Sequence, residues 1–212
     1  MKTIFFRNKE EEKVINGILK TFEVSRLRKF EGKKIDGACA IKMAIEGDDS
    51  KLYEFVIEDI FILNKDGKMF ANVPSKKSSD DKYYDVAGPI NGAARKILNK
   101  LVEAAWNEEE VVVEGREATI SVDKLALQEA GNLKAFGRLK IAFDADINGE
   151  SEHLEYLIRD IKVLDGEHGL FAKMPAKQNA EGEWHDVAHP SNKDTNATVK
   201  QLFIDAYKAA TA

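Results

Sequence analysis

The sequence predicts an α+β protein built from two tandem copies of one small domain. Three observations support this prediction. The chain repeats itself at an offset of 101 positions, each copy holds several strand-like segments, and each copy closes with one helix-like segment. Strands followed by a single helix are typical of an antiparallel sheet with a helix on one face. We assign residues 1–20 to an N-terminal extension, 21–107 to repeat 1 and 117–212 to repeat 2.

The repeat is visible by direct alignment. Residues 57–106 align without a gap on residues 158–207, and 15 of these 50 positions are identical. Unrelated sequences of average composition would match at roughly three such positions. The identities also cluster, most clearly where Asp85, Val86 and Ala87 meet Asp186, Val187 and Ala188. The two halves therefore arose by duplication, and each should adopt the same fold.

Alternating apolar segments predict the strands of each repeat. In repeat 1 they cover residues 22–30, 38–45, 53–63 and 69–73, and in repeat 2 residues 120–127, 136–143, 154–164 and 170–174. Pro74 and Pro175 end the fourth strands, because proline cannot donate to a ladder.

Apolar residues at helical spacing predict one helix over residues 93–106 and another over residues 199–210. Asn91 and Asn196 are the candidate N-caps. Residues 8–20 are assigned a short helix. Residues 107–116 are assigned to the connection between the repeats, with residues 111–113 as a candidate extra strand.

Composition limits the class of protein and its partners. With 212 residues and 43% hydrophobic residues, the chain has enough apolar material for two compact cores. The net charge is −5, and all of it comes from the second half. Residues 1–110 hold 20 basic and 20 acidic side chains, whereas residues 111–212 hold 12 basic and 17 acidic side chains. Such a chain has no long-range attraction for polyanions, so binding nucleic acid would require a local basic patch.

Sequence features also indicate where the protein acts. The apolar run at the N-terminus is too short for a signal peptide, and no segment approaches the roughly 20 apolar residues of a membrane span. We therefore expect a cytoplasmic protein with no membrane partner. Cys39 cannot form an internal disulfide, and its apolar neighbours predict a buried, unreactive thiol.

Repeat 2 carries a recognisable order of motifs. It contains Asp160-Ile161, an Asp165-Gly166 turn, Gly169-Leu170-Phe171 followed by Met174-Pro175, and then Gly182-Glu183-Trp184 followed by Asp186 to Pro190. This order and spacing resemble the SpoVG family of sporulation and septation regulators. Repeat 1 is more diverged, since Gly88 replaces the histidine that precedes the proline.

The resemblance implies a small, dimeric, site-selective nucleic-acid-binding regulator with no catalytic activity and no cofactor. Family members pair through their sheets, so we expect the two repeats to pair as a pseudo-two-fold dimer within one chain. Further association between chains is left open. Because duplicated halves can diverge, one functional face is expected to survive rather than two.

Lysine and arginine side chains near the predicted loops and helices are the candidate phosphate contacts. In repeat 1 they are Lys76, Lys77, Arg95, Lys96 and Lys100, and in repeat 2 they are Lys177 and Lys200. The alternative for each is a solvated surface of mixed charge. Repeat 1 is the stronger candidate for binding phosphate, because repeat 2 has Asn196 and Ala197 where repeat 1 has Arg95 and Lys96.

Flat side chains precede the Asp-Val-Ala segment of each repeat: Tyr83, Tyr84, Trp184 and His185. If exposed, they could stack on bases. We favour the alternative that Tyr83 and Trp184 cap the core.

Two further patterns point to other chemistry. His185, Asp186 and His189 are good metal ligands, but their segment is predicted to be extended, which points alternating side chains to opposite faces. No metal site is therefore expected. Asp59 and Asp160 interrupt apolar runs, and with no acid, nucleophile or base nearby in sequence we interpret them as hydrogen-bonded structural residues.

A second function remains open from sequence. A duplicated scaffold that has lost its positive patch could engage a protein partner through an exposed sheet edge. A basic track on one face would favour nucleic acid, whereas an exposed apolar patch would favour a protein.

Overall fold

The computed structural model describes residues 2–4, 14–32, 34–179 and 181–212. They form an α+β structure with two helices, α1 (Gly92–Asn107) and α2 (Lys193–Thr211). Within these residues the strands form one eleven-stranded, largely antiparallel sheet and two separate two-stranded hairpins.

Each repeat contributes the same series of strands. Those of repeat 1 are β2 (Ile15–Lys29), β3 (Gly37–Gly47), β4 (Leu52–Lys65), β5 (Lys68–Asn72), β6 (Ser75–Lys77), β7 (Tyr83–Asp85) and β8 (Ala87–Pro89). Those of repeat 2 are β9 (Val113–Ala130), β10 (Leu133–Ile147), β11 (Glu150–Gly166), β12 (Gly169–Lys173), β13 (Ala176–Gln178), β14 (Trp184–Asp186) and β15 (Ala188–Pro190). A short strand, β1 (Lys2–Ile4), pairs with β9.

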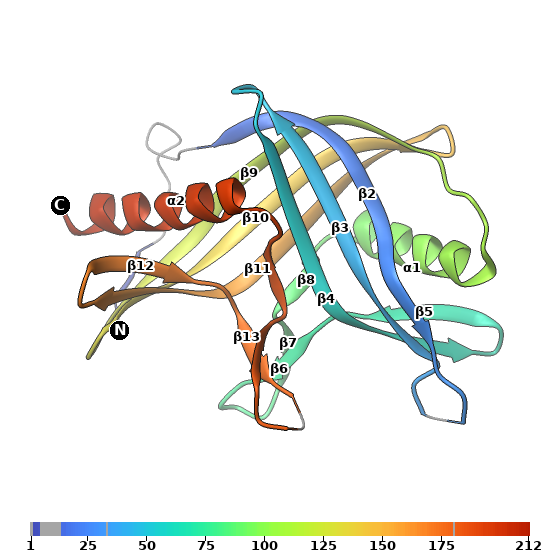
Figure 1. The fold of residues 1–212 in the computed structure, drawn as a ribbon, viewed down its shortest axis with the longest axis horizontal. Helices are drawn as coiled ribbons and strands as arrows, with labels where there is room; N and C mark the ends of the chain where they lie inside the picture. The colour runs from blue at the N-terminus through green and yellow to red at the C-terminus, as the bar shows by residue number, and fades with distance from the viewer. Residues whose placement is uncertain (1, 5–13, 33, 180) are drawn as a thin grey trace.

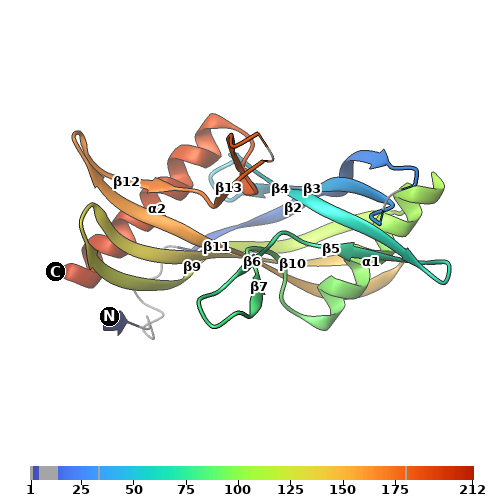
Figure 2. The ribbon, with the colours of Figure 1, turned by 90° about the horizontal axis from the view of Figure 1, so that it is seen from below.

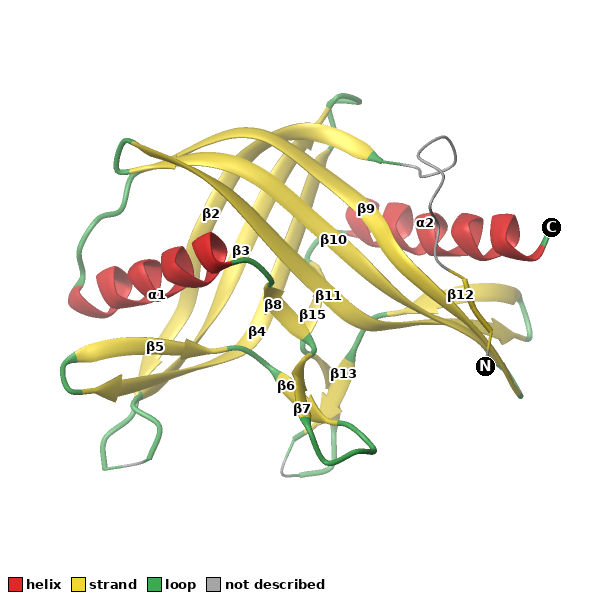
Figure 3. Ribbon diagram, turned by 180° about the vertical axis from the view of Figure 1, so that it is seen from behind, coloured by secondary structure: helices red, strands yellow, loops and turns green. Residues whose placement is uncertain are grey.

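The two repeats share the large sheet. Its order is β12-β11-β10-β9-β2-β3-β4-β15, so the first strands of the two repeats, β2 and β9, pair at its centre. Each repeat also sends one short strand to the other. Strand β8 pairs with β11, and β15 pairs with β4, at equivalent positions in the two directions. Strands from both repeats therefore lie side by side at three places (Figures 1 and 3).

One apolar core lies between the two sets of strands. In Figure 1 the strands β2, β3 and β4 cross over β9, β10 and β11, and the two helices lie at opposite ends. Phe22 of repeat 1 packs edge-on against Phe143 and Tyr156 of repeat 2, with ring centroids 5.1 and 5.7 Å apart. A single cluster of buried residues includes side chains of both repeats. The halves therefore do not have separate cores.

The predicted strands are confirmed, but several are longer than expected. Strand β2 begins at Ile15, so the short helix predicted over residues 8–20 is wrong for residues 15–20, while residues 8–13 lie outside the described part. Strand β9 begins at Val113, so the end of the predicted connection is strand. The three-residue strands were missed because so short a segment shows no periodicity.

The helices begin as predicted in one repeat and not in the other. The side chain of Asn91 accepts a hydrogen bond from the Ala94 amide and caps α1. The prediction of Asn196 as the second cap is wrong, because Asn192 caps α2 and occupies the position equivalent to Asn91. Among the described residues, neither helix is both long and apolar enough to cross a membrane.

Candidate nucleic-acid interface

Two aspartates hold an unusual backbone conformation inside long strands. Asp59 in β4 and Asp160 in β11 have φ angles of 56° and 57°, in the left-handed region that aspartate tolerates better than most residues. Pairing with the neighbouring strand shifts register beside each of them, as in a β-bulge. Ile57 and Ile60, three positions apart, are both fully buried, so the extra residue lets Asp59 turn away from the core.

Each aspartate binds side chains of the other repeat. Asp59 accepts a hydrogen bond from Nε2 of His185 at 2.9 Å and lies 3.0 Å from Nζ of Lys177. We call these three residues the Asp59 cluster. Burial raises the pKa of Asp59, but the bonds from His185 and Lys177 outweigh burial and hold it below 3.8.

The Asp160 cluster consists of Asp160, Tyr84 and Lys76. It repeats this arrangement with the repeats exchanged, since the aspartate belongs to repeat 2 and its partners belong to repeat 1. The hydroxyl of Tyr84 donates to Asp160 at 2.8 Å, and Nζ of Lys76 lies 3.7 Å from the same oxygen. Burial, followed by the bond to Asp160, raises the pKa of Tyr84 to about 12. The interpretation of both aspartates as hydrogen-bonded structural residues is confirmed.

The two clusters orient two projecting hairpins. In β6–β7, Lys76 lies opposite Tyr84, and both contact Asp160. Because side chains alternate along a strand, the next pair, Lys77 and Tyr83, faces the opposite way. The hairpin β13–β14 follows the same rule. Both hairpins project from one side of the molecule (Figures 1 and 3), and Figure 2 shows them between the two helices.

The outward position of two aromatic side chains corrects a sequence-based interpretation. Tyr83 is 72% exposed and Trp184 is 67% exposed, so they do not cap the core. Their neighbours Tyr84 and His185 face inward, and their hydrogen bonds to Asp160 and Asp59 hold the hairpins against the sheet. The sequence indicated that neighbouring side chains of these short strands face opposite ways. It could not show which residue of each neighbouring pair faces inward.

Repeat 1 carries four of its predicted basic residues on the outward face of its hairpin and in the first turns of α1. Arg95, in the first turn of α1, forms an ion pair of 2.8 Å with Asp85 at the base of the hairpin. Lys96, the next residue, is exposed, and the half-buried Lys100 lies about one turn further along α1. Lys77 pairs with Asp81, and since both are largely exposed this pair stabilises little and leaves the ammonium accessible to phosphate.

The other predicted residues are not brought to this group. Lys76 and Lys177 face the Asp160 and Asp59 clusters, and Lys177 also lies 5.5 Å from the ring centroid of Phe61. Lys200 is on α2, which runs toward the opposite end of the molecule from α1 (Figure 1). The outward face of the second hairpin carries Gln178 where the first carries Lys77.

The local charge of the two equivalent segments differs in sign. Residues 75–100 contain six basic and three acidic side chains, whereas the matching residues 176–201 contain three basic and four acidic. The hairpin and first helical turns of repeat 1 are therefore a positive region within an acidic protein.

The two histidines of the His-Asp-x-x-His segment are held apart. His185 binds Asp59, while Nδ1 of His189 lies 2.9 Å from the Pro190 carbonyl and Nε2 lies 3.7 Å from Glu58. Within the described residues, no group of three or more His, Cys, Asp and Glu side chains is placed to hold a metal ion.

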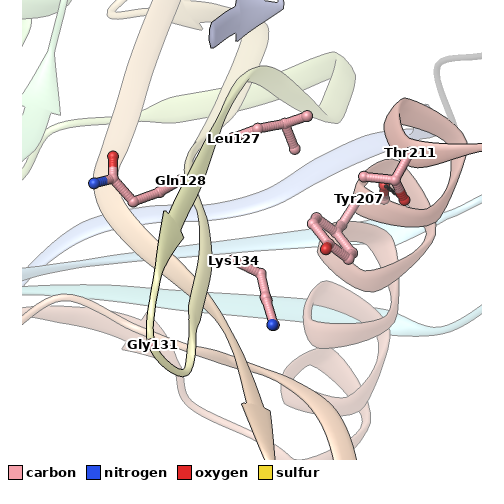
Figure 4. A pocket seen from close by; sticks show the side chains of 6 residues that line it. All are labelled: Leu127, Gln128, Gly131, Lys134, Tyr207 and Thr211. Atoms are coloured by element: carbon pink, nitrogen blue, oxygen red, sulfur yellow. Dashed lines mark hydrogen bonds between the residues drawn. The ribbon is translucent and has the colours of Figure 1, made fainter. Parts of the chain in front are cut away.

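A hollow of about 440 Å³ lies away from this surface, between the β9–β10 turn and the last turns of α2 (Figure 4). Tyr207 of α2 and Lys134 of β10 lie on opposite sides of it. Lys134 is the charged residue among those that line the hollow, and its Nζ already lies 3.6 Å from Oδ2 of Asp165. The hollow does not share the charge pattern of the hairpin surface.

Comparison with known families explains the duplicated pattern. The SpoVG family model matches residues 20–108 and matches again over residues 118–209. The chain belongs to the SpoVG family. It is a tandem SpoVG protein, as the motifs of repeat 2 predicted.

Individual SpoVG relatives align with only part of the chain. "Putative septation protein SpoVG 1" of Listeria monocytogenes is 40% identical over 74 residues, which cover 35% of this chain and 68% of the relative. "Putative septation protein SpoVG" of Caldanaerobacter subterraneus subsp. tengcongensis is 34% identical over 84 residues, which cover 40% of this chain and 80% of the relative. No solved structure gave a significant match.

Proposed function

We propose that this protein binds DNA or RNA without catalysing a reaction, and that it acts as a regulator. The phosphates are bound by Lys77, Arg95, Lys96 and Lys100. The observation that carries this proposal is the excess of three basic side chains in residues 75–100, a segment that forms one hairpin and the start of α1 and is joined by the ion pair of Arg95 with Asp85. Lysine and arginine bind phosphate, and arginine at the start of a helix adds directed donors to that site.

The proposal also explains why one repeat binds phosphate and the other does not. The Arg95 position is Asn196 in repeat 2, and the Lys77 position is Gln178. We propose that repeat 2 supports the hairpin of repeat 1 without binding phosphate itself, and that the repeats act as the covalent equivalent of a dimer. The reciprocal pairings of β8 with β11 and β15 with β4 support this view. Light scattering should then give the mass of one chain, 23.7 kDa.

Binding to short DNA and RNA of mixed sequence, measured over a range of salt concentrations, tests the proposal. The test variant replaces Lys77, Lys96 and Lys100 by alanine. The matched control replaces Lys173, Lys193 and Lys208, three exposed lysines of repeat 2, and so removes the same charge. We expect the test variant to bind more weakly and with a shallower salt dependence, by about 0.7–0.9 in the log–log slope per lost phosphate contact.

The control should bind like the unmodified protein. Equal weakening in both variants would mean that net charge matters and the surface does not. If the unmodified protein binds neither DNA nor RNA at low salt, the proposal fails and a protein partner becomes the function to test.

A further inference from the structure

Tyr83 and Trp184 are equivalent residues with no structural reason to be aromatic. Among the described residues they are the most exposed large apolar side chains, at 72% and 67%. Large aromatic side chains normally contribute to stability by burial, and these two bury little. Both lie on two-stranded hairpins that project from the same side of the molecule (Figure 1).

The opposite face of each hairpin is fixed to the sheet. Tyr84 binds Asp160 and His185 binds Asp59, one position after each exposed aromatic residue. A ring held on an anchored hairpin loses little conformational freedom when a ligand stacks on it. The two rings are therefore preorganised contact surfaces.

Polar residues flank the two rings in a way that suits a nucleic acid. Lys77 lies directly across the strand pair from Tyr83, and Gln178 lies across from Trp184. A lysine can bind a phosphate beside a stacked base, and a glutamine can hydrogen-bond to a base edge. An exposed aromatic face without such neighbours would suit a protein partner equally well.

On this basis we propose that the ligand of the hairpin surface is single-stranded nucleic acid, whose unpaired bases stack on Tyr83 and Trp184. This inference rests on the proposed function and specifies its substrate class. In a duplex the base faces are covered by their neighbours, so an aromatic side chain cannot reach them without unstacking the helix. In a single strand every base offers a free face, and stacking is tolerant of sequence.

The test compares a short single strand of mixed sequence with the duplex formed from it and its complement. The variants are Tyr83→Ala and Trp184→Ala, with Tyr83→Phe and Trp184→Phe as matched controls that keep a ring. We expect tighter binding to the single strand. Each alanine variant should lose roughly 5- to 150-fold in affinity for it, since stacking is worth about 1–3 kcal/mol per base. The phenylalanine variants should stay much closer to the unmodified protein.

Fluorescence provides a second readout that a structural role would not move. The chain has two tryptophans, so Trp106→Phe leaves Trp184 as the only one, and it can be excited selectively over the tyrosines. Stacking should quench its emission as the single strand is added. The quenching should be absent from the Trp184→Phe variant, in which the tryptophan emission comes from the partly buried Trp106 alone.

The outcomes separate this inference from the proposed function. If single strand and duplex bind equally and the alanine variants bind as well as the unmodified protein, base stacking is overturned while phosphate binding stands. If neither form binds at low salt, both fail. A loss of affinity in the alanine variants with retention in the phenylalanine variants supports the inference.

Discussion

Asp59 and His185 are 126 positions apart in the chain, yet Nε2 of His185 donates to the Asp59 carboxylate at 2.9 Å. Asp160 and Tyr84 form the equivalent bond in the other direction, at 2.8 Å. Each repeat therefore holds the hairpin of the other, in addition to the strands they exchange. The arrangement ties the hairpin surface to the folding of the whole chain.

This exchange predicts that the two repeats unfold together. The aromatic contacts of Phe22 with Phe143 and Tyr156 belong to one core built from both halves. We expect one transition by circular dichroism and by fluorescence, with coincident midpoints. Two separated transitions would show that the halves are independent domains.

Substitution at Asp160 should show how much stability its left-handed backbone and its bond from Tyr84 provide together. Asparagine tolerates the left-handed conformation and can still accept the bond from Tyr84, whereas alanine does neither. We expect Asp160→Asn to lower the free energy of unfolding by about 1 kcal/mol and Asp160→Ala by about 2–3 kcal/mol. Denaturant titration measures both. Equal losses would mean that neither the left-handed backbone nor the bond from Tyr84 contributes to stability at this position.

The pKa of Asp59 gives a stability change in acid. Burial raises this pKa, but the bonds from His185 and Lys177 dominate and hold it below the ordinary value of 3.8. A lowered pKa in the folded state stabilises the protein at pH values above 3.8. This stabilisation is lost as the pH falls through the pKa of Asp59 in the folded protein. The stability difference between the unmodified protein and Asp59→Asn should therefore shrink below pH 3.8. A difference that stays constant in acid would contradict the assignment.

Removing a buried hydroxyl should not harm the core. Tyr156 is fully buried, and within the described residues its hydroxyl has no hydrogen-bond partner. Repeat 1 has Phe55 at the equivalent position, also fully buried. Because an unpaired buried polar group costs about 1–3 kcal/mol, Tyr156→Phe should leave the free energy of unfolding unchanged or raise it by about 1 kcal/mol. A clear loss of stability would reveal a partner for this hydroxyl.

The single thiol should be unreactive in the native protein. Cys39 is buried, as its apolar neighbours predicted, and burial raises its pKa to about 12. The nucleophile in thiol chemistry is the thiolate, so labelling by a disulfide reagent at neutral pH should be slow until denaturant is added. Rapid labelling of the folded protein would indicate local opening around β3.

Much of this fold could be predicted from local patterns. The offset repeat, the alternating strands and the amphipathic helices are properties of nearby residues, and the structure contains each of them. The family was also predictable, because its motifs lie in the order that repeat 2 preserves. The cap of α2 was mispredicted because two asparagines lie near its start, and backbone geometry selects Asn192.

The surface could be predicted only in part. The sequence indicated that the basic residues of repeat 1 outnumber those of repeat 2, since charge can be counted without coordinates. It could not show that Lys76 and Lys177 face aspartates of the opposite repeat, because these contacts join distant parts of the chain. Nor could it show that Tyr83 and Trp184 face outward.

The sequence by itself therefore determined the duplicated α+β architecture, the family and the difference in charge between the repeats. The tertiary structure decided how the repeats exchange β8 and β15, and which side of each hairpin meets solvent. The physical reason is the period of a strand. Alternation places Tyr83 and Tyr84 on opposite faces, but only the bond from Tyr84 to Asp160, in the other repeat, selects the face that is left exposed.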